Sequence, residues 1–345
     1  MTGGLPLRAT QQLARHAQDT GFDGLVITEA GRTAYLSCAA AALAADIDIL
    51  TGIAVAFPRS PMVTAATAWE LADATGGRFR LGLGTQVKAH IERRYAAPFE
   101  HPGPRLREYV QAIRAIFAAF RNEAPLAFDG EFYQLSLLPA MWSPGPINVP
   151  DPPIDIAAVN PWMLRMAGQV ADGVHVHPLN TTTYLADTVL PEITAGAVAA
   201  GREPDEIEVI VPAFIIVGDT DEQQQQWREL ARIQIAFYGS TPNYAFIFEQ
   251  LGRDGITPSI RQHQKAGDLA AMAAVIDDDL LEQFIVAGTW TTVGQAIIDR
   301  YHGTATRVVN YFGAAAWSAD PQHLAAWHDV TRDIATITRA ARHTD

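Results

Sequence analysis

The chain has 345 residues, 48% of them hydrophobic and 18% charged, which allows a large buried core and leaves little room for long disordered segments. A formal net charge of −13 argues against a nucleic-acid-binding surface, because such a surface needs a basic face. The single cysteine excludes an internal disulfide, and no apolar run approaches the roughly 18 residues that span a membrane. No signal-peptide pattern is present, so we expect a cytoplasmic protein that binds neither nucleic acid nor membrane.

Short apolar runs alternate with longer Ala-rich stretches along most of the chain. The pattern predicts strands at 23–28, 48–57, 78–84, 154–159, 173–177, 207–217 and 307–312. It predicts helices at 10–20, 35–45, 62–75, 104–120, 162–170, 184–200, 221–237 and 321–342. Because the strands are apolar on both faces, this order is typical of a parallel α/β sheet with helical crossovers, and one barrel of the (β/α)8 type can absorb residues 1–345 as a single domain.

Three segments depart from this regular order. Only residues 1–7 (MTGGLPL) are available for the first of eight strands, and they predict a weak or truncated strand. Residues 122–153 are rich in proline and aromatics, and residues 239–279 end in the acidic run IDDD. Both read as loop insertions, which in a barrel serve either as part of a substrate lid or as packing decoration.

Polar or small residues follow several of the predicted strands. The stretch RFRLGLGTQVKAHIERR is not a dinucleotide fingerprint, because Val87 stands where the third glycine belongs, and it contains no P-loop. What remains is a site at the carboxyl ends of barrel strands, where catalytic residues gather. The segments at these strand ends are Thr28-Glu29, Thr51-Gly52-Ile53, Gly84-Thr85-Gln86 with Lys88 and His90, Val159-Asn160-Pro161, and His175-Val176-His177-Pro178.

Cationic and helix-terminal groups in these segments suit an anionic ligand. Pro161 is well placed as the first residue of a helix, whose N–H groups and dipole would favour a phosphate. Lys88, His90 and Arg94 add donors, although a solvated helix face is the alternative for each and is the better reading of Arg93 and Arg94.

His175 and His177 stand two apart on a predicted strand, so they are expected to face the same side. A metal site would need a third ligand, and the neighbouring sequence offers none. We therefore expect no metal, and a contact to a cofactor phosphate or to substrate instead.

Several segments together resemble a known family. TGIAVAFPRSPM, GRFRLGLGTQVKAHIERR, GEFY, AFYGSTPNY and IDDD resemble the bacterial luciferase-like superfamily, and more closely its coenzyme F420-dependent oxidoreductases of actinobacteria. The similarity runs from about Gly21 to the C-terminal helix. It implies a TIM barrel of the bacterial luciferase type with insertions, and a deazaflavin whose ring lies in the barrel mouth. It also implies a non-prolyl cis peptide behind the ring, at Gly52–Ile53.

The resemblance further implies roles for individual residues. Relatives commonly carry a histidine just after the second strand, whereas this chain reads TEAGRTAYL there. Glu29 and His90 are then the candidate proton sources, and Glu29 is equally well read as a hydrogen-bond acceptor only. The implied cofactor contacts are Gly52 and Ile53 behind the ring, Thr85, Gln86, Lys88 and His90 beyond the fourth strand, where the basic residues would face an anionic arm, and Ala158, Val159, Asn160, Pro161, Trp162, Met163, His177 and Pro178 near the phosphate.

Three functions fit these features. The first is an F420-dependent oxidoreductase that transfers a hydride to or from a small organic substrate. The second is an FMN-dependent monooxygenase on the same barrel. The third is a barrel that has lost its cofactor and only binds, which the missing histidine and weak first strand motivate. By analogy with relatives we expect a homodimer.

Overall fold

The structure is a computed structural model that describes residues 1–319 and 323–341. The chain divides into two compact units. Unit 1 comprises Met1–Ala158, Trp162–His175 and Ile193–Glu208, and unit 2 comprises Val159–Pro161, Val176–Glu192 and Val209–Asp345. The expectation of a single domain therefore stays a prediction. Among the described residues, none of the helices combines the length and the apolar character that crossing a membrane requires.

Unit 1 contains a parallel sheet in the order β1-β2-β3-β5-β8-β9, with β4 paired to β5. Its strands are apolar and almost wholly buried, as expected for a parallel sheet covered by crossover helices. The bounds are β1 Thr2–Gly3, β2 Gly24–Thr28, β3 Asp48–Thr51, β4 Ala54–Val55, β5 Phe79–Gly84, β8 Ile154–Ala158 and β9 Gly173–Val176.

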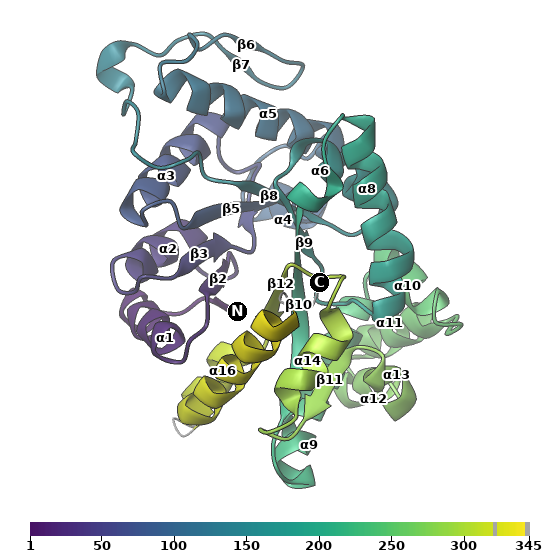
Figure 1. Ribbon diagram of the computed structural model, residues 1–345. Coiled ribbons are helices and arrows are strands. Elements are labelled where there is room, and N and C mark those ends of the chain that lie inside the picture. The colour runs from purple at the N-terminus through teal and green to yellow at the C-terminus, as the bar shows by residue number, and fades with distance from the viewer. Residues whose placement is uncertain (320–322, 342–345) are drawn as a thin grey trace. The chain divides into compact units, whose positions relative to one another are not determined.

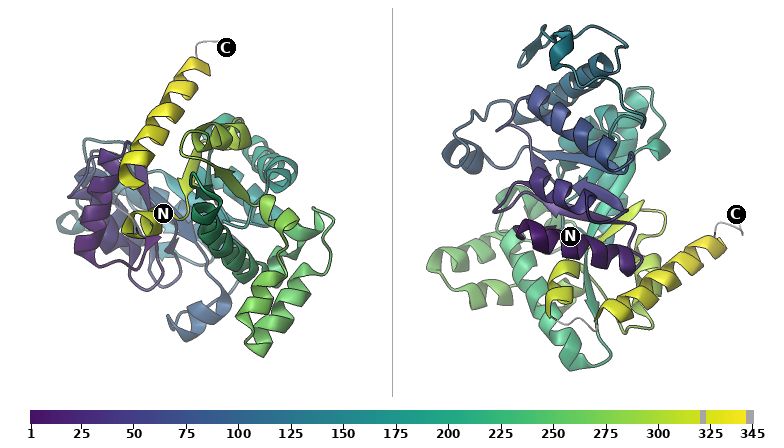
Figure 2. Two further views of the ribbon diagram at one scale, coloured as in Figure 1. Left: turned by 90° about the horizontal axis from the view of Figure 1, so that it is seen from below. Right: turned by 90° about the vertical axis from the view of Figure 1, so that its left-hand side faces the viewer.

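Helices follow the strands of unit 1 and cover them. Figure 1 shows α1, α2 and α3 beside β2, β3 and β5, and the right-hand view of Figure 2 looks onto these three helices. Trp69 of α3 stacks on Phe117 of α5 at 5.3 Å between ring centroids, which joins the two helices over the sheet. The bounds are α1 Leu7–Asp19, α2 Ala34–Ala42, α3 Pro61–Ala74, α4 Lys88–Arg93, α5 Pro102–Phe120, α6 Pro161–Val170 and α8 Leu190–Ala199.

Local sequence signals set where several helices begin. Ser60 caps α3 by accepting a hydrogen bond from the Val63 N–H, and Pro61 occupies the first turn. In unit 2, Thr220 and Gln223 form a reciprocal capping box at the start of α9. These caps satisfy N–H groups that have no partner inside the helix.

Unit 2 is built around β10 (Glu208–Val217), which pairs in parallel with β11 (Ile285–Gly288) and with β12 (Arg307–Asn310). Helices α11 and α12 pack together, and both also pack against α9. The helical segments are α7 Thr182–Tyr184 with a π-helical turn at Leu185–Val189, α9 Asp221–Gly239, 3₁₀ turn Pro242–Tyr244, α10 Ala245–Glu249, α11 Ile256–Ala266, α12 Leu269–Ala274, α13 Asp278–Glu282, α14 Val293–Tyr301, α15 Gly313–Ala319 and α16 His323–Ala341.

Most predicted elements are present within a few residues, including the weak first strand, which is only two residues long. The predicted strand 48–57 is interrupted between β3 and β4. The expectation of a loop at 239–279 is wrong: this segment carries α10, α11, α12 and part of α13, whose caps Asp268 and Asp277 mark helix starts that the prediction overlooked. Strand β11 was not predicted, because four residues give too short an alternation to recognise, and the nine-residue helix α14 that follows it was also missed.

The segment 122–153 does read as an irregular insertion. It contains the two-stranded antiparallel hairpin of β6 (Phe128–Asp129) and β7 (Gln134–Leu135) and a 3₁₀ turn at Ala140–Trp142. Glu108 of α5 holds the hairpin turn by accepting hydrogen bonds from the N–H groups of Glu131, Phe132 and Tyr133. Whether this segment covers a substrate stays a prediction.

Candidate functional site

The carboxyl ends of the parallel strands of unit 1 meet at one edge of its sheet, and several predicted site residues lie there. Glu29 follows β2, Gly52 and Ile53 follow β3, Thr85 and Gln86 follow β5, and Ala158 ends β8. Strand order rather than sequence distance brings them together, because β2, β3, β5 and β8 are successive neighbours in the sheet.

The peptide bond between Gly52 and Ile53 is cis, which confirms the prediction made from the resemblance. Gly52 leaves no room for a side chain, because an added Cβ would lie 2.3 Å from Val26 Cγ1. Gly82 of β5 is more confined, because its Cβ would lie 2.0 Å from the Thr51 carbonyl oxygen and 2.6 Å from His175 Nε2. Backbone at this edge therefore approaches its neighbours more closely than any residue but glycine allows.

Glu29 is held by several partners. Its carboxylate accepts from the Val55 N–H at 2.8 Å and from both terminal nitrogens of Arg59. Burial works to lower the pKa of Arg59, but hydrogen bonding and attraction to Glu29 raise it overall. A carboxylate engaged in this way is poorly placed to donate a proton, and the catalytic role predicted for Glu29 stays a prediction.

The residues beyond β5 are more open. Thr85 and Gln86 are half-buried, and Gln86 has a positive φ of 58°, which turns the chain into α4. Lys88 is exposed and lies 3.7 Å from Glu92 one turn along α4. His90 is exposed, and its side chain has no partner among the described residues. His90 and Lys88 are thus available to an anionic group from solvent.

The predicted phosphate segment belongs partly to unit 1 and partly to unit 2. In unit 2, the Tyr184 hydroxyl donates to the Val159 carbonyl and so fixes the residue before Asn160 and Pro161. In unit 1, Trp162 is half exposed and packs so closely on the start of α5 that a Cβ on Gly103 would lie 2.2 Å from its ring. Met163 is half-buried in the first turn of α6. Their contacts to a cofactor stay predictions.

His177 of unit 2 lies in an aromatic cluster that sequence reasoning did not assign to the site. Its ring centroid is 4.7 Å from that of Tyr238 and 4.5 Å from that of Tyr244, and its Nδ1 accepts from the Leu179 N–H. The neutral ring therefore carries its proton on Nε2. Burial lowers the pKa of His177 to about 3, so the ring is neutral at pH 7 and can donate a hydrogen bond but supplies no positive charge.

The hydroxyl groups of Tyr238 and Tyr311 are hydrogen-bonded at 2.7 Å, and Tyr311 also donates to Gln234. The motif AFYGSTPNY, which contains Tyr238 and Tyr244, is the sequence signal that could have pointed to these residues, because a buried tyrosine hydroxyl usually needs a hydrogen-bond partner. Pro178 follows His177 and is half-buried.

His175 has different neighbours from His177, so the expectation that the two histidines share one face is not supported by their surroundings. Strand β9 ends at Val176, and the strand alternation on which that expectation rested does not extend to His177. His175 lies in unit 1 beside Gly52 and Gly82, with Nε2 3.7 Å from Asp155 Oδ2. Among the residues that the structure describes, no group of three or more His, Cys, Asp or Glu side chains is arranged to hold a metal ion.

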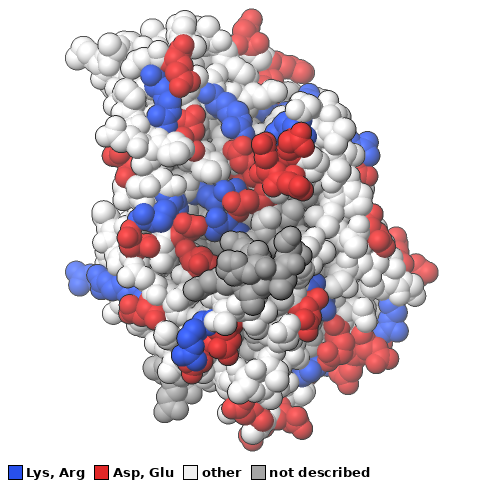
Figure 3. Space-filling model, in the orientation of Figure 1, with Lys and Arg blue, Asp and Glu red and all other residues white. Residues whose placement is uncertain are grey.

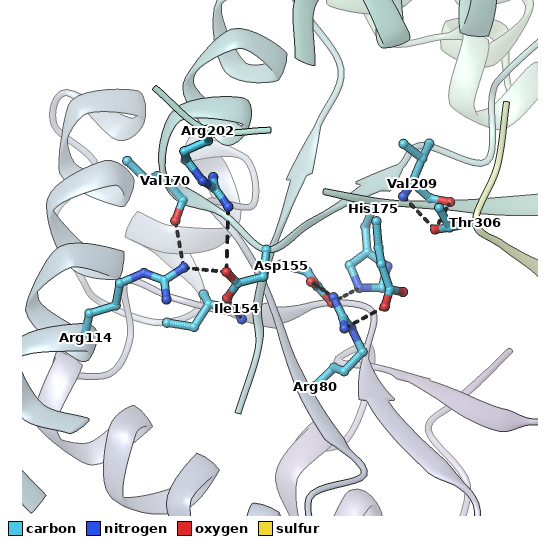
Figure 4. Close-up of polar contacts among 11 residues, drawn as sticks. Arg80, Arg114, Ile154, Asp155, Val170, His175, Arg202, Val209 and Thr306 are labelled. Atoms are coloured by element: carbon cyan, nitrogen blue, oxygen red, sulfur yellow. Dashed lines mark hydrogen bonds and ion pairs between the residues drawn. The ribbon is translucent and has the colours of Figure 1, made fainter. Parts of the chain in front are cut away.

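Figure 4 shows a charged network in the interior of unit 1, centred on Arg80. Arg80 donates to both oxygens of the fully buried Asp155, at 3.0 and 2.6 Å, and to Glu208 at 2.9 Å. Burial favours the neutral acid, but His175 and Arg80 outweigh it and hold the pKa of Asp155 below its usual value. This network was not predicted, because Arg80 and Asp155 are single charges in otherwise apolar strands 75 residues apart, and nothing local shows that they become neighbours.

A cavity of about 830 Å³ opens at the amino ends of the same strands, opposite the predicted site. Its arginines are already paired: Arg114 with Asp172, Arg121 with Asp151, and Arg80 as above. Acidic and basic side chains are also interspersed over the molecular face seen in Figure 3. Each arginine that lines the cavity thus already has a carboxylate partner, so the cavity is poorly suited to bind an anionic ligand.

Comparison with known proteins identifies the class. The family model described as luciferase-like monooxygenase matches residues 1–307, so the chain belongs to this family. It is 38% identical over 312 residues to an uncharacterised protein of Mycobacterium tuberculosis, covering 88% of this chain and 92% of that one. It is 27% identical over 303 residues to the 5,10-methylenetetrahydromethanopterin reductase of Archaeoglobus fulgidus, covering 85% and 86%.

Solved structures agree on the fold. The coenzyme F420-dependent tetrahydromethanopterin reductase of Methanopyrus kandleri matches with a TM-score of 0.76 at 22% identity, covering 96% of both chains. The FMN complex of the oxygenating constituent of 3,6-diketocamphane monooxygenase from Pseudomonas putida matches with a TM-score of 0.66 at 17% identity, covering 97% and 96%. The chain thus has the luciferase-like TIM-barrel fold, which it shares with an F420-dependent reductase and with an oxygenating constituent solved in complex with FMN.

Proposed function

We propose that this protein is an oxidoreductase that transfers a hydride between coenzyme F420 and a small organic substrate. The observation that carries the proposal is the gathering of Glu29, Gly52, Ile53 and Thr85 at the carboxyl edge of the unit 1 sheet, with the exposed His90 in the helix that follows β5. Similarity over most of the chain to an F420-type reductase supports it. The luciferase-like family supports an enzyme more broadly, and the choice of F420 is the part that experiment must decide.

The residues present fit such a cofactor. Gly52, Ile53 and Thr85 offer main chain and a hydroxyl to a flat ring, and Gln86, Lys88 and His90 offer donors to an anionic arm. In the phosphate segment, the residues that would hold the cofactor are Ala158, Val159, Asn160, Pro161, Trp162, Met163, His177 and Pro178.

Bound F420 would supply two-electron hydride chemistry, and the protein would supply orientation, exclusion of water and a proton. His90 is the proposed proton carrier, because its imidazole is accessible and has no partner among the described residues. His177 would bind as a neutral donor through Nε2–H, because Nδ1 is already an acceptor for the Leu179 N–H.

A cofactor titration tests the proposal. Purified apoprotein is titrated separately with F420 and with FMN while cofactor fluorescence is followed, and the cofactor that binds is then used in a hydride-transfer screen of small carbonyl and alkene compounds. Binding of F420 with turnover supports the proposal. Binding of FMN with no detectable affinity for F420 refutes it.

A second candidate is an FMN-dependent monooxygenase, which the family description and the FMN-bound structural relative favour. Oxygen uptake with reduced FMN distinguishes it from the first. Binding of neither cofactor would favour a barrel that has lost its cofactor, in line with the two-residue first strand and the absence of a histidine in the segment that follows β2.

We also propose that the protein is a cytoplasmic homodimer. Leu36 and Leu43, on and just after α2, and Val63 on α3 are 58%, 77% and 55% exposed, and apolar side chains on neighbouring helices are common at interfaces between subunits. Light scattering on the purified protein tests this: a mass near 37.4 kDa would refute it, and twice that mass would support it.

A further inference from the structure

The main chain just after the cis peptide is held by two residues, Glu29 and Arg59, that lie outside the strands. The Ile53 carbonyl accepts from the Glu29 N–H at 3.2 Å. The Val55 N–H donates to Glu29 Oε2 at 2.8 Å, and the Val55 carbonyl accepts from Arg59 Nη1 at 3.0 Å. Glu29 and Arg59 thus bind three main-chain polar groups within residues 53–55.

Strand geometry explains why the side chains are needed. β4 pairs with β5 on one side, where the Ala56 N–H donates to the Gly84 carbonyl. The main-chain groups of Val55 point the other way, toward β2, because hydrogen-bonding direction alternates along a strand. β2 has already ended at Thr28, so the Glu29 carboxylate and Arg59 replace the strand that is missing there.

The pair itself has one fixed arrangement. The Glu29 side chain is only 4% exposed and that of Arg59 is 19% exposed, and the guanidinium contacts both carboxylate oxygens. Arg59 also donates to Thr33 Oγ1 at 3.3 Å and lies 5.0 Å above the ring of Tyr35. A lysine has one ammonium and cannot make these contacts together.

We propose that Glu29 and Arg59 are positioning residues that fix the Ile53–Val55 main chain as the wall behind the cofactor ring, and that Glu29 is not the proton donor. The effect on the cofactor passes through the backbone of the span and needs no contact between Glu29 and the ring. The ring's presence rests on the proposed function, whereas the fixing of the backbone does not.

The test replaces both members of the pair at once. Glu29→Met/Arg59→Met removes two buried charges together, which commonly preserves folding, whereas removing one would leave the other uncompensated. The matched control is Arg121→Met/Asp151→Met in the same unit, because Arg121 also holds a carboxylate and the carbonyls of Ile147 and Val149. Glu29→Gln is the conservative variant, since its amide oxygen still accepts from the Val55 N–H. Arg59 loses its anionic partner in this variant, but its side chain is 19% exposed and keeps its bonds to the Val55 carbonyl and Thr33.

Hydrogen–deuterium exchange without cofactor is the first readout. In the double variant, the amide of Val55 is expected to exchange at least about tenfold faster than in wild type and in the control, because it has lost its acceptor. In Glu29→Gln, the Val55 amide is expected to keep most of the protection that it has in the wild type. An unchanged exchange rate of the Val55 amide, in a double variant that circular dichroism shows to be folded, would overturn the proposal. An equal acceleration of the Val55 amide in the control variant would overturn it as well.

Affinity for whichever cofactor the wild type binds is the second readout. The dissociation constant is expected to rise about tenfold in the double variant and to stay unchanged in the control. In Glu29→Gln it is expected to stay close to the wild-type value. If Glu29→Gln instead binds cofactor like wild type and loses more than about a hundredfold in kcat, Glu29 is the proton donor and the proposal is overturned. If wild type binds neither F420 nor FMN, the proposed function fails, and the exchange data alone decide whether the pair fixes the backbone.

Discussion

Replacing Arg80 by methionine should destabilise unit 1 strongly, because it leaves a buried carboxylate without its main partner. Asp155 is fully buried and takes two hydrogen bonds from Arg80, at 3.0 and 2.6 Å. His175 also favours the ionised carboxylate, but it replaces these bonds only in part, because its Nε2 lies 3.7 Å from Asp155 Oδ2, beyond normal hydrogen-bond length. Breaking a buried ion pair on one side costs about 3–5 kcal/mol, and methionine fills much of the volume, so the lost pairing dominates over a cavity.

The measurement is urea unfolding followed by far-UV circular dichroism, with Arg114→Met as the control. Arg114 pairs with Asp172, but their side chains are 43% and 30% exposed, so solvent screens the pair and its loss should cost at most about 1 kcal/mol. Arg80→Met/Asp155→Leu, which removes both buried charges, should recover most of the stability. A cost below about 1 kcal/mol for Arg80→Met, or no recovery in the double variant, would show that Asp155 does not depend on Arg80.

Three further predictions concern individual residues. Gly82→Ala should lower the melting temperature, because its Cβ would lie 2.0 Å from the Thr51 carbonyl oxygen. The control is Gly31→Ala, because a Cβ at Gly31 has no atom within 4 Å and the residue lies outside the left-handed region; equal melting temperatures of the two variants would contradict the close approach at Gly82. His90→Ala should weaken binding of F420 in a fluorescence titration by about tenfold and leave the melting temperature unchanged, and an unaltered affinity would remove His90 from the site. Burial lowers the pKa of His177 to about 3 in the folded state, below its unfolded value of 6.5, so the unfolded chain binds the extra proton and the free energy of unfolding should fall as pH drops from 6.5 toward 3. His177→Gln should lose part of this pH dependence. An unchanged pH profile in the variant would show that His177 is not buried as a neutral ring.

The sequence by itself determined the class of fold and much of the element order. Apolar runs such as 79–84 and 154–158 are buried on both faces, and the helices between them have clear polarity patterns and caps, so local pattern and tertiary role agree. The family resemblance also located the cis peptide at Gly52–Ile53 to the residue. The local signal was too weak for β11, which has four residues, whereas α12 and α13 carry aspartate caps that the prediction overlooked.

Only the tertiary structure decided which polar side chains pair. Arg80 and Asp155 are 75 residues apart, and Glu29 and Arg59 are 30 apart, so no local pattern links them. Within unit 2, the cluster around His177 likewise brings together His177, Tyr238 of α9 and Tyr311, which follows β12. Hydrophobic periodicity records which face of an element is buried, whereas the partner of a buried charge or hydroxyl depends on which strand becomes its neighbour, and that is settled only when the sheet assembles.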